Sequence, residues 1–355
     1  MESNVLHNKN IKSIEPLPSP THYWRTYPIT QAIQNQIIEY RQLIEDILMH
    51  RNQKLIVIVG PCSIHDPVAG IEYAKKLKKI ADQFSDQMMI AMRVYFEKPR
   101  TALGWKGYIN DPNLNDTFDV KLGLSKAREF LLQIAEIGLP AATEYLDPFT
   151  PQFLGDLVSW GAIGARTTES QPHRVMTSGL SMPIGFKNGT GGSIQIAIDA
   201  IIAAKSEHVF MGIDANGLSS VVSTNGNPNT HLVLRGGKTG PNFDSKSIEK
   251  SAKLLRENKL IESLIVDCSH ANSNKDHRNQ PKVFENVLNQ RINGASVIRG
   301  LMLESHLNEG NQQLTQNISD LDYGISITDS CMNWEQTEKL LTTTNQKLTL
   351  SLNKD

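Results

Sequence analysis

One stretch, residues 54–68 (KLIVIVGPCSIHDPV), combines a buried strand, a short loop and the start of a helix. Its apolar run does not alternate with polar residues, which is typical of a strand covered on both faces in a parallel sheet. Gly60-Pro61 ends the run. Asp66-Pro67 then predicts a helix, because aspartate is favoured at the N-cap and proline at the first helical position.

Short apolar runs of this kind recur along the chain and alternate with helical patterns. Helices are predicted over Val68–Gln83, Gln152–Ser159 and Ser245–Asn258, before Gly138, and around residues 194–202. The ten predicted strands are Lys54–Val59, Met88–Tyr95, Pro140–Tyr145, Trp160–Arg166, Pro183–Lys187, His208–Ile213, Leu218–Ser223, His231–Arg235, Ser263–Cys268 and Ser296–Leu303.

Two of these strands predict a hairpin outside the main sheet. His208–Ile213 and Leu218–Ser223 are separated by Asp-Ala-Asn-Gly, and Asn216-Gly217 is a strong hairpin-turn signal. The other eight predict an α/β protein, a (β/α)8 TIM barrel with an N-terminal extension and an inserted β-hairpin. An open doubly wound sheet is the alternative fold.

The expected organisation is one barrel with additions at its ends. Residues 1–30 are polar and carry four prolines, which predicts an arm outside the core. We divide the chain into an N-terminal arm and helix (1–50), a catalytic barrel (51–345) with a hairpin insert (208–224), and a C-terminal tail (346–355).

Composition excludes several classes of function. The net charge of −1 argues against a nucleic-acid partner, which normally requires a basic face. No apolar run approaches the length of about 18 residues that suggests a membrane span, and no signal peptide is expected. The three cysteines (Cys62, Cys268 and Cys331) indicate a reducing, cytoplasmic location without disulfides.

Six cations follow or end the predicted strands, where barrel enzymes build their active sites. In a nearly neutral protein this concentration indicates a site for anions, and phosphates suit the forked guanidinium and the compact ammonium group. Six cations suit two phosphorylated molecules better than one. They are Arg93, Lys98, Arg100, Arg166, Lys187 and Arg235.

A second set at the same ends offers metal ligands. Cys62, His270, Glu304 and Asp329 combine thiolate, imidazole and carboxylates, which suit one divalent transition ion such as Mn, Fe, Co or Zn. His306 is a weaker alternative ligand. Spacing alone leaves open that Cys62 is a buried apolar residue and His270 a turn residue. Cys268 and Cys331 are interpreted as structural.

Seven motifs in order resemble the type I 3-deoxy-D-arabino-heptulosonate 7-phosphate (DAHP) synthases over roughly residues 20–340. They are GPCSIHDP, MRVYFEKPRTALGWKGYINDP, GAIGARTTESQ, GFKNGT, LRGGK, DCSHANSNKD and LESHLNEGNQ. The resemblance implies a barrel that condenses phosphoenolpyruvate with D-erythrose 4-phosphate, releases phosphate and opens the shikimate pathway to chorismate and the aromatic amino acids.

The resemblance also implies roles for individual residues. Cys62, His270, Glu304 and Asp329 match the metal ligands, and the Lys98-Pro99-Arg100-Thr101 segment matches the erythrose 4-phosphate loop. We expect Lys98 to deliver a proton and Glu144 to orient a water molecule beside phosphoenolpyruvate. The residues expected to bind phosphoenolpyruvate are Arg93, Lys98, Arg166, Lys187 and Arg235, and Ala165 is a further expected substrate-binding residue.

Regulation and assembly are further implications. In the family, the N-terminal arm and hairpin form subunit contacts and a pocket for an aromatic amino acid, here tyrosine or phenylalanine, in a homodimer or homotetramer. One departure is Gly191, where the family usually has Asp, so a helix cap is expected to be lost there. Two alternatives compete: a sister synthase that uses arabinose 5-phosphate, and a barrel that only binds metabolites.

Overall fold

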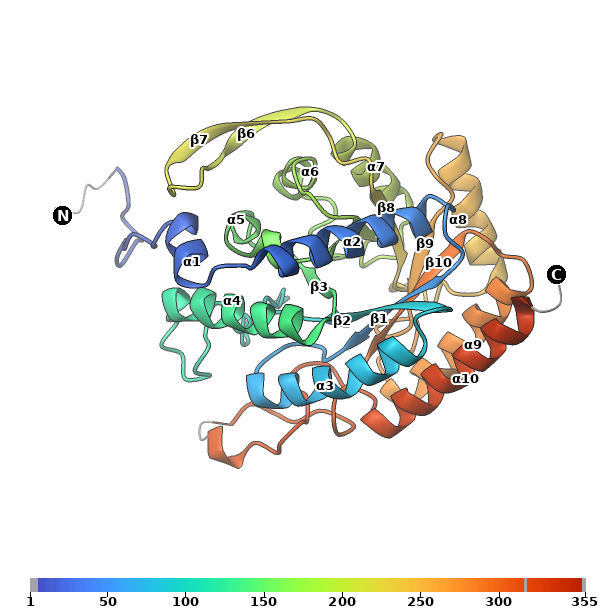
Figure 1. The fold of residues 1–355 in the computed structure, drawn as a ribbon. Helices are drawn as coiled ribbons and strands as arrows, with labels where there is room; N and C mark the ends of the chain where they lie inside the picture. The colour runs from blue at the N-terminus through green and yellow to red at the C-terminus, as the bar shows by residue number, and fades with distance from the viewer. Residues whose placement is uncertain (1–5, 316–317, 353–355) are drawn as a thin grey trace.

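The computed structural model describes residues 6–315 and 318–352, and its centre is a closed barrel of parallel strands (Figure 1). The first strand, β1, pairs with both β2 and β10, which closes the sheet. The predicted TIM barrel is confirmed and the open sheet is wrong. Around the barrel the order is β1 (Leu55–Gly60), β10 (Ile298–Glu304), β9 (Leu264–Asp267), β8 (Thr230–Leu234), β5 (Ile184–Lys187), β4 (Trp160–Ile163), β3 (Ala141–Glu144) and β2 (Met88–Arg93).

The inserted hairpin is confirmed as a separate two-stranded sheet. Strands β6 (His208–Ile213) and β7 (Ser219–Thr224) pair antiparallel, and they lie beside α6 rather than in the barrel wall (Figure 1). In the turn, Asp214 Oδ1 accepts hydrogen bonds from the backbone N–H groups of Asn216 and Leu218. Gly217 has φ +77°, a left-handed conformation that glycine adopts without steric cost.

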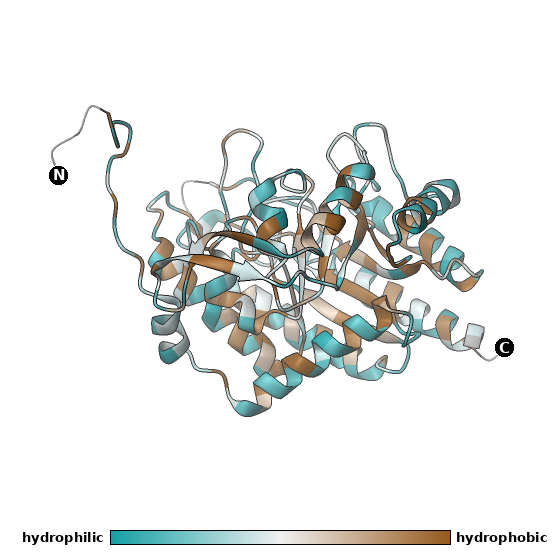
Figure 2. Cartoon of the chain, turned by 90° about the horizontal axis from the view of Figure 1, so that it is seen from above, coloured by the Kyte–Doolittle hydropathy of each residue, from teal (hydrophilic) through white to brown (hydrophobic). Residues whose placement is uncertain are grey.

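The outer helices connect successive strands. Asp66 caps α3 as predicted, because its side chain accepts from the backbone N–H groups of Val68 and Ala69. Figure 2 shows hydrophilic and hydrophobic residues alternating along these amphipathic helices. No helix in the described ranges combines the length and apolarity needed to cross a membrane. The helices are α3 (Pro67–Gln83), α4 (Val120–Ile137), α5 (Thr150–Leu154), α6 (Gln171–Thr177), α7 (Gln195–Ala204), α8 (Ser245–Glu257), α9 (Gln280–Ile292) and α10 (Trp334–Leu352), with 3₁₀ turns at Gly155–Leu157, His277–Asn279 and Ile318–Asp320.

Several predicted boundaries differ from the structure; most strands are a few residues shorter than predicted, as β4 shows by ending at Ile163. The helix expected over 152–159 divides into α5 and a 3₁₀ turn. Helix α7 begins at Gln195 with Ile194 at its N-cap, so residue 191 does not hold the cap position and the loss of a cap expected there is wrong. Helix α10 runs to Leu352, into the stretch expected to be a tail.

The N-terminal segment closes one end of the barrel. Helix α2 (Gln31–Leu48) packs Ile44, Ile47 and Leu48 in one apolar cluster with residues of the barrel strands. The preceding helix α1 (Pro20–Thr26) buries Tyr23, which is 2% exposed and meets the Phe153 ring edge-on. The arm expected outside the core therefore contributes to it from α1 onward.

Candidate active site and metal centre

A cavity of about 950 Å³ lies at the carboxyl ends of the barrel strands and gathers nearly all the predicted site residues. Parallel strands in a closed barrel end at one rim, so residues distant in sequence meet there. Cys62 lies beside it, buried against Lys98. The predicted residues that line it are Arg93, Lys98, Pro99, Arg100, Thr101, Glu144, Ala165, Arg166, Lys187, Arg235, His270, Glu304 and Asp329.

Three of the four predicted metal ligands form a compact group. Ligand atoms of Cys62, Glu304 and Asp329 all lie within 4.8 Å of one another, and Gly60 pairs with Glu304 in the sheet register. His270 borders this group, with Nε2 3.8 Å from Glu304 Oε1. One sulfur, one imidazole nitrogen and two carboxylates are a donor set that suits a borderline divalent transition ion.

The alternative ligand His306 faces elsewhere. It lies against the rings of His65 and Tyr73, and its Nδ1 accepts a hydrogen bond from the backbone N–H of Leu307. Burial, together with the neighbouring His65, lowers the pKa of His306 to about 3, so its imidazole is neutral. His306 is not in the compact ligand group found among the described residues.

Lys98 contacts the thiol directly. Its Nζ lies 3.0 Å from Cys62 Sγ and 3.2 Å from the Cys62 carbonyl oxygen. Burial and the nearby Glu304 carboxylate raise the pKa of Cys62 to about 12. Burial alone lowers the pKa of Lys98, but Cys62, Glu304 and Asp329 raise it above its ordinary value. Lys98 is therefore a positively charged ammonium group beside the ligand group.

The deep cations are paired with carboxylates. Arg93 is fully buried, with Nη2 3.0 Å from Glu304 Oε1 and its guanidinium over the Tyr95 ring. Lys187 Nζ lies 3.2 Å from Glu144 Oε2. Burial raises the pKa of Glu144, but Lys187 and Lys98 outweigh it and hold that pKa below its ordinary value. These pairs offset the cost of burying charge, which an isolated ion cannot recover.

The outer cations have no such partners. In the described ranges, none of Arg100, Arg166 and Arg235 forms a salt bridge with a carboxylate. Arg166 instead lies 3.4 Å from Thr101 Oγ1, which links the loops after β2 and β4. The rim therefore offers positive charge to an anion, as the sequence predicts.

The sequence interpretation missed three polar residues next to the site. Asp267 is fully buried between Lys187 and His270. Gln280 hydrogen-bonds both backbone groups of Glu304. Glu97 accepts from the backbone N–H groups of residues 146 and 147. A signal existed for Asp267 and Glu97, because an acidic residue at or just after a buried strand is unusual.

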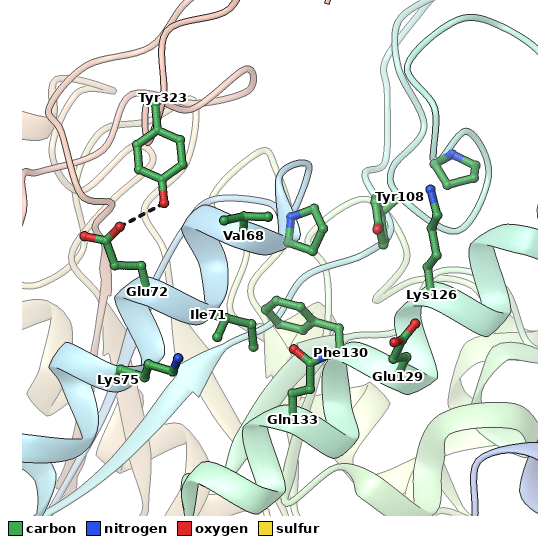
Figure 3. Close-up of a pocket in the computed structure, with 12 residues that line it drawn as sticks. Val68, Ile71, Glu72, Lys75, Tyr108, Lys126, Glu129, Phe130, Gln133 and Tyr323 are labelled. Carbon is green, nitrogen blue, oxygen red and sulfur yellow. Dashed lines mark hydrogen bonds between the residues drawn. The ribbon is translucent and has the colours of Figure 1, made fainter.

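Two other cavities contain none of the predicted site residues. One, of about 660 Å³, lies between α3 and α4 over Phe130 and is bounded by the Tyr323–Glu72 hydrogen bond (Figure 3). The other, of about 700 Å³, lies between α6 and the β6–β7 hairpin. The chemistry is therefore concentrated at the barrel rim.

The chain belongs to the DAHP synthetase I family, whose model matches residues 29–342. It is 49% identical to the Tyr-sensitive phospho-2-dehydro-3-deoxyheptonate aldolase of Escherichia coli K12, covering 98% of each chain. It is 46% identical to the phenylalanine-inhibited enzyme of Saccharomyces cerevisiae, covering 95% of this chain and 92% of the relative. A solved phospho-2-dehydro-3-deoxyheptonate aldolase from Francisella tularensis superposes with a TM-score of 0.93 at 42% identity, over 96% of this chain and 99% of that one.

Proposed function

We propose that this protein condenses phosphoenolpyruvate with D-erythrose 4-phosphate to give DAHP and inorganic phosphate. Family membership supports the reaction class. The observation that supports the proposal most directly is a cavity lined by cations beside a group of one thiol and two carboxylates, with the imidazole of His270 at its border. Two phosphorylated substrates and one divalent ion account for both sets of groups.

The cluster fits a metal by the chemistry of its donors. Cys62, His270, Glu304 and Asp329 would hold one divalent transition ion, which when bound supplies Lewis acidity for an aldehyde oxygen. The adjacent Lys98 ammonium group stabilises the Cys62 thiolate, because opposite charges at 3.0 Å favour the ionised thiol.

The cations position the two substrates. The carboxylate and phosphate of phosphoenolpyruvate are bound by Arg93, Arg166, Lys187 and Arg235. Arg100 and Thr101 bind the phosphate of the tetrose. Holding both molecules in a reactive geometry removes much of the entropic cost of a bimolecular reaction.

The reaction balances with the groups present. C3 of phosphoenolpyruvate forms a bond to C1 of erythrose 4-phosphate, and Lys98 gives a proton to the aldehyde oxygen. Glu144 orients the water that adds at C2. The water loses both of its protons as its oxygen becomes the C2 carbonyl. One proton restores the Lys98 ammonium group, and the other leaves with inorganic phosphate when the C2–O bond breaks.

Phosphate release on mixing both substrates tests this proposal directly. We expect release with erythrose 4-phosphate, loss after chelation, and recovery on adding Mn²⁺ or Co²⁺. Arabinose 5-phosphate serves as the second sugar. Faster turnover with that pentose would assign the chain to the sister reaction, and no release with either sugar would favour a binding protein.

We also propose feedback inhibition by an aromatic amino acid, tyrosine or phenylalanine. Relatives of similar identity are named Tyr-sensitive, Trp-sensitive and phenylalanine-inhibited. The cavity of about 700 Å³ between α6 and the hairpin is the candidate site. Ser178, which follows the last residue of α6, is hydrogen-bonded to Thr224 of β7, and Arg174 of α6 binds the Thr168 carbonyl near Arg166. A ligand bound in this cavity can therefore influence the active-site rim through α6.

Inhibition assays with tyrosine, phenylalanine and tryptophan identify the effector. Phe210→Ala, which alters the cavity wall, is expected to weaken inhibition while uninhibited turnover is unchanged. Ser219→Ala, at an exposed position of the same hairpin that does not line the cavity, is the matched control. Equal inhibition of both variants and the unaltered protein would place the effector elsewhere.

We further propose a homodimer or homotetramer in the cytoplasm. Supporting assembly, the hairpin exposes Val209, Met211, Leu218 and Val221, an apolar surface that a partner copy can cover. Supporting the location, the three cysteines are unpaired thiols. Light scattering gives the mass in solution, and a monomer at micromolar concentration would refute the assembly.

A further inference from the structure

Strand β9 ends in a short hydrogen-bonded chain behind His270. Ser269 Oγ donates to Asp267 Oδ1 at 2.6 Å and lies 2.7 Å from His270 Nδ1. Asp267 Oδ2 is also 3.0 Å from that nitrogen. Both Asp267 and Ser269 are at most 2% exposed, so water does not compete for these bonds.

The chemistry of the chain determines which imidazole nitrogen carries hydrogen. An ionised carboxylate only accepts hydrogen bonds, so the Ser269 hydroxyl hydrogen points to Asp267. The hydroxyl oxygen must then accept from His270, which places a hydrogen on Nδ1. In the neutral imidazole, the form that binds metals, Nε2 then keeps its lone pair. This is the nitrogen that lies 3.8 Å from Glu304 Oε1 beside the ligand group.

The same carboxylate reaches the substrate cations. Asp267 Oδ2 lies 3.4 Å from Lys187 Nζ, which also pairs with Glu144. One buried acid therefore contacts both a predicted metal ligand and a predicted phosphoenolpyruvate-binding lysine. A capping function for the β9 end alone explains the bond from Ser269 N to Asp267, but not the contacts to His270 and Lys187.

We propose that Asp267 and Ser269 are positioning residues that hold His270 in the Nδ1-protonated form and turn Nε2 toward the ion. Asp267 also ties this ligand to Lys187, so that metal binding and phosphoenolpyruvate binding share one carboxylate. The inference rests on the proposed function, since it requires a metal at this cluster. Removing such outer partners typically weakens metal affinity roughly 10–100-fold.

The test uses Ser269→Ala, which removes the hydroxyl and leaves the backbone bond from residue 269 to Asp267. Calorimetry with Mn²⁺ on the metal-stripped protein is expected to give a dissociation constant roughly 10–100-fold higher than that of the unaltered protein. The visible spectrum of bound Co²⁺ should also change, because it reports ligand geometry. Cys268→Ala is the matched control. The Cys268 side chain neighbours Ser269 in the chain but packs in the apolar core.

A second variant separates the two contacts of the acid. Asp267→Asn is expected to weaken Mn²⁺ binding and also to raise KM for phosphoenolpyruvate, whereas Ser269→Ala leaves that KM unchanged at saturating metal. If circular dichroism shows that Ser269→Ala does not fold, calorimetry of Asp267→Asn with Mn²⁺ tests the positioning role instead.

The outcomes distinguish this inference from the proposed function. An unaltered protein that binds no Mn²⁺ at the cluster contradicts the metal-dependent function itself. An unaltered protein that binds Mn²⁺, with variants that bind equally tightly and give the same Co²⁺ spectrum, overturns the positioning role alone.

Discussion

The same eight strands form both ends of the barrel, but the residues buried at the two ends differ in polarity. At the amino ends, α2 covers an apolar cluster, and Trp160 donates a hydrogen bond to His231 inside it. At the carboxyl ends, Arg93, Lys187 and Asp267 are buried as charges. The closed end gains stability from apolar burial, whereas buried ion pairs contribute little net stability. Changes at the open end should therefore affect chemistry, and changes at the closed end should affect folding.

The largest effect is expected from Cys62→Ala at the open end. Lewis-acid stabilisation is worth several kcal/mol, so losing one ligand should reduce kcat on the order of a thousandfold. Apolar packing elsewhere is untouched, so the unfolding free energy of the metal-stripped protein should change by no more than about 1 kcal/mol. Turnover, bound metal and urea denaturation are measured together.

Cys331→Ala is the control, because the Cys331 thiol is also buried but does not belong to the ligand group of Cys62, Glu304 and Asp329. Near-normal turnover in Cys62→Ala would return Cys62 to the role of a buried apolar residue.

Ile47→Ala makes the reciprocal change at the closed end. Ile47 is fully buried under the barrel, so truncation should lower the unfolding free energy by about 2–5 kcal/mol. It lies at the opposite end of the strands from the rim residues, so kcat at a permissive temperature should stay the same. Urea denaturation and steady-state kinetics measure both quantities.

Ile38→Ala on the same helix is the matched control, since Ile38 is 55% exposed. A large loss of kcat in Ile47→Ala without loss of stability would break the division between the two ends.

His231 gives the closed end a pH dependence. Burial lowers the pKa of His231 to about 4 from an ordinary 6.5, and Nε2 must stay unprotonated to accept from Trp160. The folded protein therefore binds fewer protons than the unfolded chain in this window. The stability that His231 contributes is present above about pH 6.5 and is lost as pH falls toward 4, with a maximum on the order of 3 kcal/mol.

His231→Gln removes this titration. The difference in unfolding free energy between the two proteins should vary between pH 6.5 and 4 and be constant above that window. A difference that is independent of pH would mean that the pKa of His231 is the same in the folded protein and the unfolded chain.

The sequence predicted the barrel and the rim because each depends on a repeated local pattern. Continuous apolar runs identify strands buried on both faces, and closure brings their ends together. It did not predict that α2 seals the barrel, since its amphipathic pattern shows a buried face without showing what covers it. Asp267 was visible in the sequence, but its contacts with both Lys187 and His270 depend on strand order and rotamers that spacing does not encode.

The smallest expected effect is a change in unfolding free energy at the open end, where two adjacent glycines follow β5. A methyl group added at Gly191 would meet no atom within 4 Å, and this glycine has no left-handed φ. Gly191→Ala should therefore stabilise the protein by about 0.4–1 kcal/mol, because alanine lowers the conformational entropy of the unfolded chain.

Gly192 has φ +103° and faces Thr239 and Gly237 of the loop after β8. Gly192→Ala should therefore destabilise the protein by more than about 1 kcal/mol. Thermal unfolding of both variants measures the contrast, and equal shifts would mean that the two loops are not packed against each other as the structure indicates.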